Sequence, residues 1–171
     1  MRLLLQRVSQ ARVEIAGAVV GEIGQGLLVL AGFGQADTLD LPGTKPWRAL
    51  CDKVLDLRLF PDEAGKMNLS LREAQSGQGG DLLLVSQFTL YADTRRGRRP
   101  SFSSAAPPEV ASQLYDRLVH DLRAAQLANC GGGSDNNTGG GFATGVFGAE
   151  MNLTFTNWGP VTILLDSADF A

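Results

Sequence analysis

The 171-residue sequence has few of the side chains on which metal sites and many hydrolytic sites depend. It contains one histidine, His120, and two cysteines, Cys51 and Cys130, with no CxxC or other metal-like spacing. A zinc site needs three or four such ligands, so we expect neither a bound metal nor a cofactor. A nucleophile–histidine–acid site would have to be built around His120.

Long apolar runs and a strong charge imbalance are also absent. No stretch approaches the roughly 20 apolar residues of a membrane span. The apolar run near the N-terminus, residues 3–5, is too short for the core of a signal peptide. Together with the small number of cysteines, these absences lead us to expect a cytoplasmic protein with no membrane contact.

The net charge of −3 argues against a surface that binds nucleic acid throughout. One local exception is the run Arg95-Arg96-Gly97-Arg98-Arg99. It could contact phosphates, or it could be a solvated loop.

What the sequence does contain is a hydrophobic fraction of 44 %, sufficient for one domain over residues 1–171. Apolar runs with partial alternation predict strands at 2–9, 11–15, 19–23, 27–33, 58–60, 82–85, 151–156 and 161–165. Helical spacing predicts one helix over 47–57, with Pro46 in its first turn, and another from Pro107-Pro108 to about Leu127. His120 falls on the polar face of the second helix, so a histidine-dependent site is not favoured.

The run 129–141 is rich in glycine and asparagine and predicts a flexible insertion. No GK[ST] ends it, so a phosphate-binding loop is not indicated.

Two segments are candidates for chemistry. Ser86, Gln87 and Thr89 follow a buried strand, where polar side chains either line a site or satisfy nearby backbone groups. The N–H groups of Phe88 and Thr89 could form an oxyanion hole. The acids at 62–63 and Glu150 could form an acid–base pair, although their spacing does not require it.

The second segment is Gly159-Pro160, which lies between two predicted strands. It is either a plain hairpin turn or a rigid pair of carbonyl acceptors for a cation.

Both segments belong to a set of motifs by which the sequence resembles the D-aminoacyl-tRNA deacylases of bacteria and eukaryotes. The motifs are Met1-Arg2, Gln6-Arg7-Val8, Leu57-Arg58-Leu59-Phe60, Gly65-Lys66-Met67-Asn68, Ser86-Gln87-Phe88-Thr89-Leu90-Tyr91, Arg99-Pro100-Ser101-Phe102, Thr144-Gly145, Phe147-Gly148-Ala149-Glu150-Met151 and Asn157-Trp158-Gly159-Pro160-Val161-Thr162. The chain departs from the family pattern at Ala92, Arg96 and Glu150, and the run 129–141 looks like an insertion.

The resemblance implies an enzyme that hydrolyses the ester between a D-amino acid and the 3′-terminal adenosine of tRNA. It implies that Phe88 and Thr89 offer backbone N–H groups to the ester, with Ser86 and Gln87 shaping the pocket. Phe147 and Met151 would pack on the adenine. The ribose 2′-hydroxyl of the substrate would replace a protein nucleophile, and Thr89 as the nucleophile is the alternative mechanism.

The resemblance further implies a homodimer in which Gly159-Pro160, with its peptide bond cis, enters the partner's site. Its carbonyls would hold the substrate ammonium so that an L side chain is rejected, and Arg7 would brace this loop. Glycyl-tRNA would then also be a substrate. We expect an α/β fold with one mixed, strongly curved, barrel-like β-sheet and two main helices. A non-catalytic nucleic-acid-binding protein of the same fold remains the alternative.

Overall fold

The computed structural model describes residues 1–74, 80–128 and 140–170. Most of the predicted insertion 129–141 therefore lies outside the described residues.

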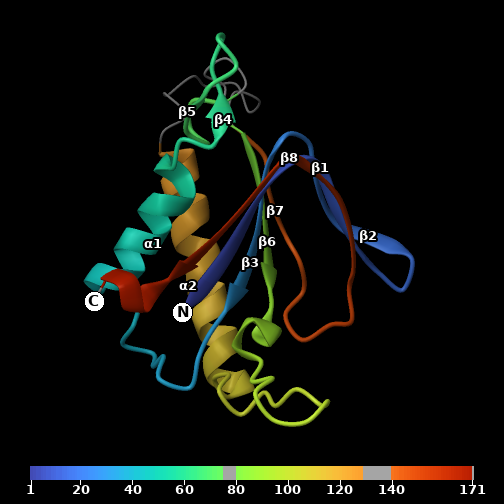
Figure 1. The fold of residues 1–171 in the computed structure, drawn as a ribbon, viewed down its shortest axis with the longest axis vertical. Coiled ribbons are helices and arrows are strands. Elements are labelled where there is room, and N and C mark those ends of the chain that lie inside the picture. Colours follow the sequence, from blue (N-terminus) through green and yellow to red (C-terminus); the bar gives the residue numbers. More distant parts are fainter. Residues whose placement is uncertain (75–79, 129–139, 171) are drawn as a thin grey trace.

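Eight strands, two α-helices and two short 3-10 helices make up the described chain (Figure 1). In chain order they are β1 (Arg2–Ile15), β2 (Ala18–Ile23), β3 (Gly26–Gly32), α1 (Lys45–Asp56), β4 (Phe60–Pro61), β5 (Met67–Leu69), β6 (Asp81–Ser86), η1 (Phe88–Tyr91), α2 (Pro108–Leu127), β7 (Phe142–Thr144), β8 (Asn152–Asp166) and η2 (Ser167–Phe170).

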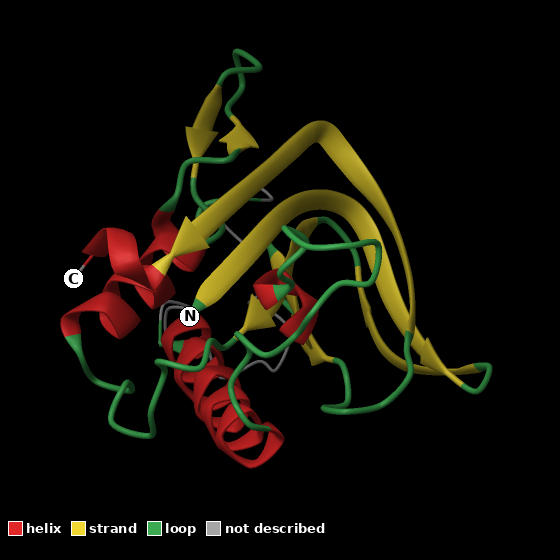
Figure 2. Ribbon diagram, turned by 60° about the horizontal axis from the view of Figure 1, so that its bottom comes forward, coloured by secondary structure: helices red, strands yellow, loops and turns green. Residues whose placement is uncertain are grey.

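The main sheet has the order β2-β1-β3-β6-β7, and β8 pairs with the remaining edge of β1. The β3–β6 and β6–β7 pairs are parallel and the others are antiparallel, so the sheet is mixed. The sheet curls until β2 approaches β7, as Figure 2 shows by its strongly bent strands. At this closure a Cβ on Gly21 would lie 2.7 Å from the carbonyl oxygen of Thr144, so glycine permits the close approach. The expected mixed, barrel-like α/β fold with two main helices is confirmed.

The central strands β3 and β6 are buried on both faces, which explains their nearly continuous apolar sequences. One face packs under the two helices through Leu27, Val29, Leu82, Leu84, Leu50, Val54, Leu114 and Leu118. The other face fills the inside of the curled sheet through Leu28, Leu83, Val85, Val8, Val13 and Ile23. The alternation of side chains along each strand thus divides the core into two compartments.

The two helices begin and end close to the predicted positions. The side chain of Thr44 accepts a hydrogen bond from the Trp47 N–H at the start of α1, and Pro46 lies in the first turn. The Trp47 indole donates to Asp121 on α2 at 2.9 Å and links the helices. Among the described helices, none is long and apolar enough to span a membrane.

The strand predictions omit the short strands β5 and β7, and they divide two long strands of the structure. The predicted strands 2–9 and 11–15 are one strand, β1. The predicted strands 151–156 and 161–165 are also continuous as β8, so the hairpin interpretation of Gly159-Pro160 is wrong. The reason is that β1 runs alongside as an unbroken partner on both sides of the Gly-Pro pair.

The register of β8 on β1 shows how the strand accommodates a proline. Val8 pairs with Asn157, but Gln6 pairs with Thr162, so residues 158–161 all lie opposite Arg7. This is an irregular bulge, which tolerates a residue that has no N–H to donate.

Candidate active site

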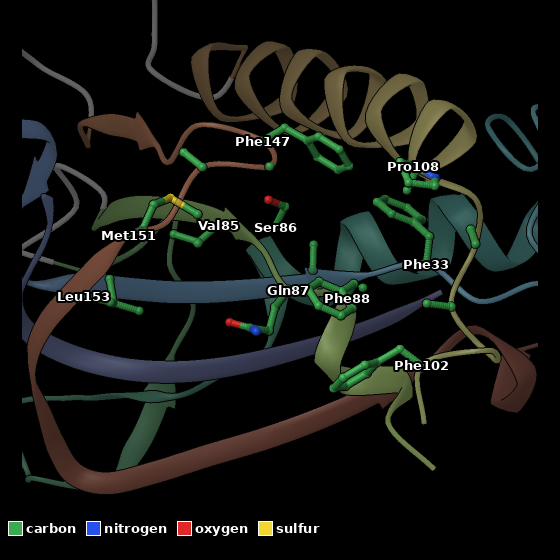
Figure 3. Close-up of a pocket in the computed structure, with 17 residues that line it drawn as sticks. Phe33, Val85, Ser86, Gln87, Phe88, Phe102, Pro108, Phe147, Met151 and Leu153 are labelled. Atoms are coloured by element: carbon green, nitrogen blue, oxygen red, sulfur yellow. The ribbon is translucent and has the colours of Figure 1, made fainter. Parts of the chain in front are cut away.

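A cavity of about 550 Å³ opens at the carboxyl ends of the parallel strands β3 and β6 (Figure 3). It is lined mainly by apolar groups: Ala31, Gly32, Phe33, Val85, Ser86, Gln87, Phe88, Phe102, Ala105, Ala106, Pro108, Ala111, Phe147, Gly148, Ala149, Met151 and Leu153. Its size lies within the range of small-molecule sites, and the ends of parallel strands are a common position for them.

The floor of the cavity comes from the end of β6, where Ser86, Gln87 and Phe88 line it. The Gln87 N–H donates to the carbonyl of Ala31 at 2.7 Å, which ties this turn to β3. The chain then enters the 3-10 helix η1, not the strand end that we expected for Phe88 and Thr89. The N–H groups of Phe88 and Thr89 lie in the first turn of η1, where N–H groups have no acceptor within the helix.

Thr89 lies apart from the other residues of its motif. It is exposed and does not line the cavity. Its hydroxyl accepts a hydrogen bond from the Gln87 amide at 2.6 Å. The structure therefore brings Ser86, Gln87 and Phe88 to the cavity surface but leaves the Thr89 side chain outside it.

Phe147 and Met151, which the resemblance implies would pack on the adenine, line another wall of the cavity (Figure 3). The Phe147 ring lies 6.0 Å from the ring of Tyr115 on α2. Tyr115 donates its hydroxyl to the carbonyl of Leu84 at 2.8 Å, and burial raises the pKa of this phenol, which keeps the donor protonated. Met151 packs over Gly145, where a Cβ would be 2.7 Å from its sulfur.

Arg2 holds η1 against the sheet. It donates to the carbonyl of Leu90 at 2.9 Å, and its guanidinium lies 4.6 Å from the centre of the Tyr91 ring. Its Nε also donates to Asp166 at 2.8 Å. Burial acts to raise the pKa of Asp166, but the hydrogen bonds from Arg2 and the Ala168 N–H outweigh it, so the pKa of this carboxyl is lowered. The motif Met1-Arg2 includes this arginine, but the sequence assigned it no role, because its partners lie 88 and 164 residues away in the chain.

Arg7 and Gly159-Pro160 form a second group. Arg7 is 7 % exposed, and its Nε donates to the carbonyl of Trp158 at 2.8 Å. It also donates to the carbonyl of Leu59, and its guanidinium stacks 4.4 Å from the centre of the Trp158 ring. Burial lowers the pKa of Arg7. The Gly159–Pro160 peptide bond is cis, Gly159 has a φ of +134°, and both residues are exposed.

Asn157 and Thr162 close the bulge around this pair. The Val161 N–H donates to the Asn157 side-chain oxygen at 2.8 Å, and the Asn157 amide donates to the Thr162 hydroxyl at 3.0 Å. Asn157 and Thr162 belong to the motif, but the sequence assigned neither residue a role. The structure shows that they hold the backbone on either side of Gly159-Pro160.

The second group does not reach the cavity of its own chain. Arg7 pairs with Leu27, whereas the cavity begins at Ala31, four residues further along β3. At about 3.3 Å per residue, that is roughly 13 Å along the strands. Gly159, Pro160 and Arg7 are accordingly absent from the cavity lining.

The histidine, cysteine and acidic side chains considered as nucleophiles, bases or metal ligands lie outside the cavity in the described part of the chain. His120 is on α2 with its side chain 76 % exposed, and its ring nitrogen is 3.2 Å from Asp121. Burial raises the pKa of the Cys51 thiol to about 12, so it is not a thiolate nucleophile at neutral pH. Asp62 and Glu63 lie in the β4–β5 turn, well away from the 145–151 segment (orange in Figure 1) that carries Glu150, so these acids form no pair. Within residues 1–74, 80–128 and 140–170, no three His, Cys, Asp or Glu side chains gather in a way that could hold a metal ion.

The sequence matches the model of the family described as D-Tyr-tRNA(Tyr) deacylase over residues 4–166. Relatives named D-aminoacyl-tRNA deacylase include those of Nitratidesulfovibrio vulgaris (strain DP4) and Solidesulfovibrio magneticus. The first is 53 % identical over 99 % of this chain and 94 % of its own. The second is 57 % identical over 99 % of this chain and 97 % of its own.

Two solved structures have a similar fold. One, named "c-Myc DNA Unwinding Element Binding Protein", is 33 % identical with a TM-score of 0.77 over 97 % of this chain and 98 % of its own. The other, named "Structural Analysis of a probable eukaryotic D-amino acid tRNA deacylase", has a TM-score of 0.73 over 96 % of this chain and 97 % of its own. Its 23 % identity supports the fold alone.

Proposed function

Because the chain belongs to the D-Tyr-tRNA(Tyr) deacylase family, we propose that it hydrolyses the ester between a D-amino acid and the 3′-terminal adenosine of tRNA. The observation that carries the proposal is the cavity, in which the Ser86–Phe88 turn faces Phe147 and Met151. A cavity of about 550 Å³ is of suitable size for an aminoacylated nucleoside. The reaction would take place in the cytoplasm, where charged tRNA is used.

The substrate would lie across the cavity with its two ends on opposite walls. The adenine packs against Phe147 and Met151, whose apolar side chains suit the face of a base. The ester carbonyl lies at the start of η1, where the N–H groups of Phe88 and Thr89 stabilise the negative charge that develops on its oxygen. Ser86 and Gln87 shape the floor between these positions.

The α-ammonium of the substrate would be held by the carbonyl oxygens of Gly159 and Pro160 from a partner subunit in a homodimer. This arrangement is supported by the exposure of the pair and by its separation from the cavity of its own chain. Arg7 and Asn157 brace the backbone on both sides of the pair. With the ammonium fixed, an L side chain collides with the Gly-Pro backbone, while a D side chain points outward.

The proposed mechanism uses no nucleophile from the protein. The described residues of the cavity lining include no Asp, Glu, His, Lys or Cys that could act as a general base. The ribose 2′-hydroxyl of the substrate lies next to the ester and would activate the attacking water by a hydrogen bond. Water adds to the ester carbonyl, the amino acid leaves as the free acid, and the ribose 3′-oxygen takes up a proton. Thr89 is the alternative nucleophile, but its hydroxyl lies outside the cavity lining and accepts a bond from Gln87.

The test is incubation of the purified protein with D-tyrosyl-, L-tyrosyl- and glycyl-tRNA. We expect release of D-tyrosine and of glycine, because glycine has no side chain to collide with the backbone, and retention of L-tyrosine on its tRNA. Equal release of both tyrosine enantiomers would contradict the proposed chirality mechanism, and release of none would contradict the enzymatic function.

A second candidate function is non-catalytic binding of nucleic acid. The 33 % identical structure belongs to a protein that is named for binding a DNA unwinding element, and the run 95–99 supplies exposed arginines. A protein with this function would bind nucleic acid with an affinity that falls steeply with salt and would release no amino acid from any charged tRNA.

A further inference from the structure

The loop that follows η1 is a closed, strongly basic structure beside the cavity. The backbones of Asp93 and Ser101 exchange two hydrogen bonds, of 2.7 and 2.9 Å, which close the loop at its base. Gly97, with a φ of +67°, turns the chain at its tip. Residues 94–100 are all exposed. A shallow concavity lined by Asp93, Arg95, Arg96 and Ser101 lies at its base.

The cations in this loop are not equivalent. Arg95 makes two side-chain bonds to Asp93, at 2.9 and 2.7 Å, and these bonds lower the pKa of the Asp93 carboxyl. The opposite charges of Arg95 and Asp93 therefore cancel. Arg96, Arg98 and Arg99 have no acidic partner among the residues that the structure describes. Three uncompensated charges therefore project from one loop of a protein whose net charge is −3.

Two exposed aromatic rings connect this loop to the cavity. Phe102 is the last residue of the 93–102 loop and is 40 % exposed, and Phe88 is 57 % exposed. Their rings pack edge to face with centres 4.9 Å apart, and both line the same side of the cavity (Figure 3). Large aromatic side chains left in solvent beside free cations are typical of surfaces that bind single-stranded nucleic acid. The bases stack on the rings and the phosphates contact the arginines.

We propose that the 93–102 loop binds the unpaired nucleotides that precede the terminal adenosine of the tRNA. A base stacks on Phe102, and Arg96, Arg98 and Arg99 contact the phosphates leading away from the cavity. The inference rests on the proposed function, because the terminal adenosine defines where the strand begins. The cavity holds a single nucleoside, so the preceding nucleotides must cross its rim, and the Phe88–Phe102 side presents both aromatic rings and positive charge.

The test compares a long and a short substrate. The short one, D-tyrosine esterified to adenosine, fills the cavity but has no preceding nucleotide, whereas D-tyrosyl-tRNA has them all. The test variants are the triple change Arg96→Gln, Arg98→Gln, Arg99→Gln and the single change Phe102→Leu. A matched control, Lys45→Gln, Arg48→Gln, Lys53→Gln, removes three exposed cations from α1.

We expect the loop triple variant to lower kcat/KM for D-tyrosyl-tRNA roughly tenfold or more, through KM, and to have a much smaller effect on the adenosine ester. The slope of log kcat/KM against log salt should become shallower by about 2, at about 0.7 per phosphate contact. Phe102→Leu should lower kcat/KM for the tRNA about fivefold or more relative to the adenosine ester. The α1 variant should behave as the unmodified protein with both substrates.

Equal losses on both substrates would overturn the inference, because the loop would then act on the cavity or the fold. Unchanged kinetics of the loop variant on D-tyrosyl-tRNA would also overturn the inference, because the arginines would then be solvated and would not contact the tRNA. If the unmodified protein hydrolyses neither substrate, the proposed function fails. In that case fluorescence anisotropy with a single-stranded RNA ending in CCA still decides the inference, since loss of affinity in the loop variant alone supports it and equal affinity refutes it.

Discussion

At the scale of single residues, the candidate site depends on backbone groups that a few side chains hold in place. Arg7 donates to two carbonyls while stacked on Trp158, and Asn157 bonds the Val161 N–H on the far side of the Gly-Pro pair. The motifs in the sequence identified these residues. They did not show that Arg7 is 7 % exposed or that the cavity excludes the Thr89 side chain, because both facts depend on contacts between distant segments.

Thr89→Ala tests whether the threonine hydroxyl takes part in the reaction. We expect near-normal turnover of D-tyrosyl-tRNA, because alanine keeps the backbone N–H of residue 89 and the hydroxyl bonds only Gln87 in the described structure. Single-turnover kinetics measure this. In parallel, a tRNA with a 2′-deoxy terminal adenosine should be resistant to hydrolysis. A loss of about 10³-fold or more in the alanine variant would instead support a threonine nucleophile.

Gly159→Ala tests how tightly the bulge is packed. A Cβ at this position would lie 2.6 Å from the Arg7 guanidinium and 2.8 Å from the Val161 side chain, at a φ of +134°. We expect a loss of about 1–3 kcal/mol in the free energy of unfolding, measured with urea. Gly65→Ala is the matched control, because Gly65 also has a positive φ, +76°, but open space around it. Equal losses for the two variants would show that contact with Arg7 is unimportant.

At the scale of secondary-structure elements, the pairing of β1 with β8 connects the two groups of the site. Arg2 at the start of β1 bonds Asp166 at the end of β8 and the carbonyl of Leu90 in η1. Arg7, further along β1, holds the β8 bulge. Periodicity predicted apolar strands at both places, but it could not show that β8 continues through a proline, because continuity depends on the partner strand.

Asp166→Asn tests the contribution of the Arg2–Asp166 ion pair through its pH dependence. The pKa of Asp166 is lowered from 3.8 in the folded protein, so the carboxylate stabilises the fold above pH 3.8, and this contribution is lost as pH falls through the folded pKa. We expect the variant to be less stable than the unmodified protein by up to about 1 kcal/mol near neutral pH. Urea unfolding should show the two proteins converging well below pH 3.8. A difference that stays constant with pH would exclude the ion pair as its cause.

At the scale of the whole molecule, the curled sheet separates the two groups that the proposed reaction must bring together. The cavity lies at the carboxyl ends of β3 and β6, whereas the Gly-Pro pair lies on β8, opposite Arg7 of β1 and near the start of β3. The proposed homodimer resolves this separation if each chain supplies its Gly159-Pro160 to the cavity of the other. In a two-fold dimer, each site then consists of parts from both chains.

Mixing two inactive variants tests this arrangement. Ala149→Trp places a bulky ring on the cavity wall, and Gly159→Ala displaces the backbone of the Gly-Pro pair. We expect each variant alone to be nearly inactive. An equal mixture, after subunit exchange, should recover about a quarter of normal activity, because half of the dimers are mixed and each has one intact site. No recovery in a mixture shown by mass to contain mixed dimers would mean that Gly159-Pro160 does not act in the partner's cavity.

The amino-acid sequence by itself determined the class of protein, both helices and the motifs around Ser86 and Gly159, because hydrophobic spacing and motif residues are local properties. Only the tertiary structure decided that β8 is one bulged strand, that Phe88 and Thr89 open a 3-10 helix, and that Tyr115 and Arg2 support the site. These features arise from pairing and packing between residues far apart in the chain. The same long-range pairing places the Gly-Pro carbonyls away from their own cavity, a separation that no local pattern records.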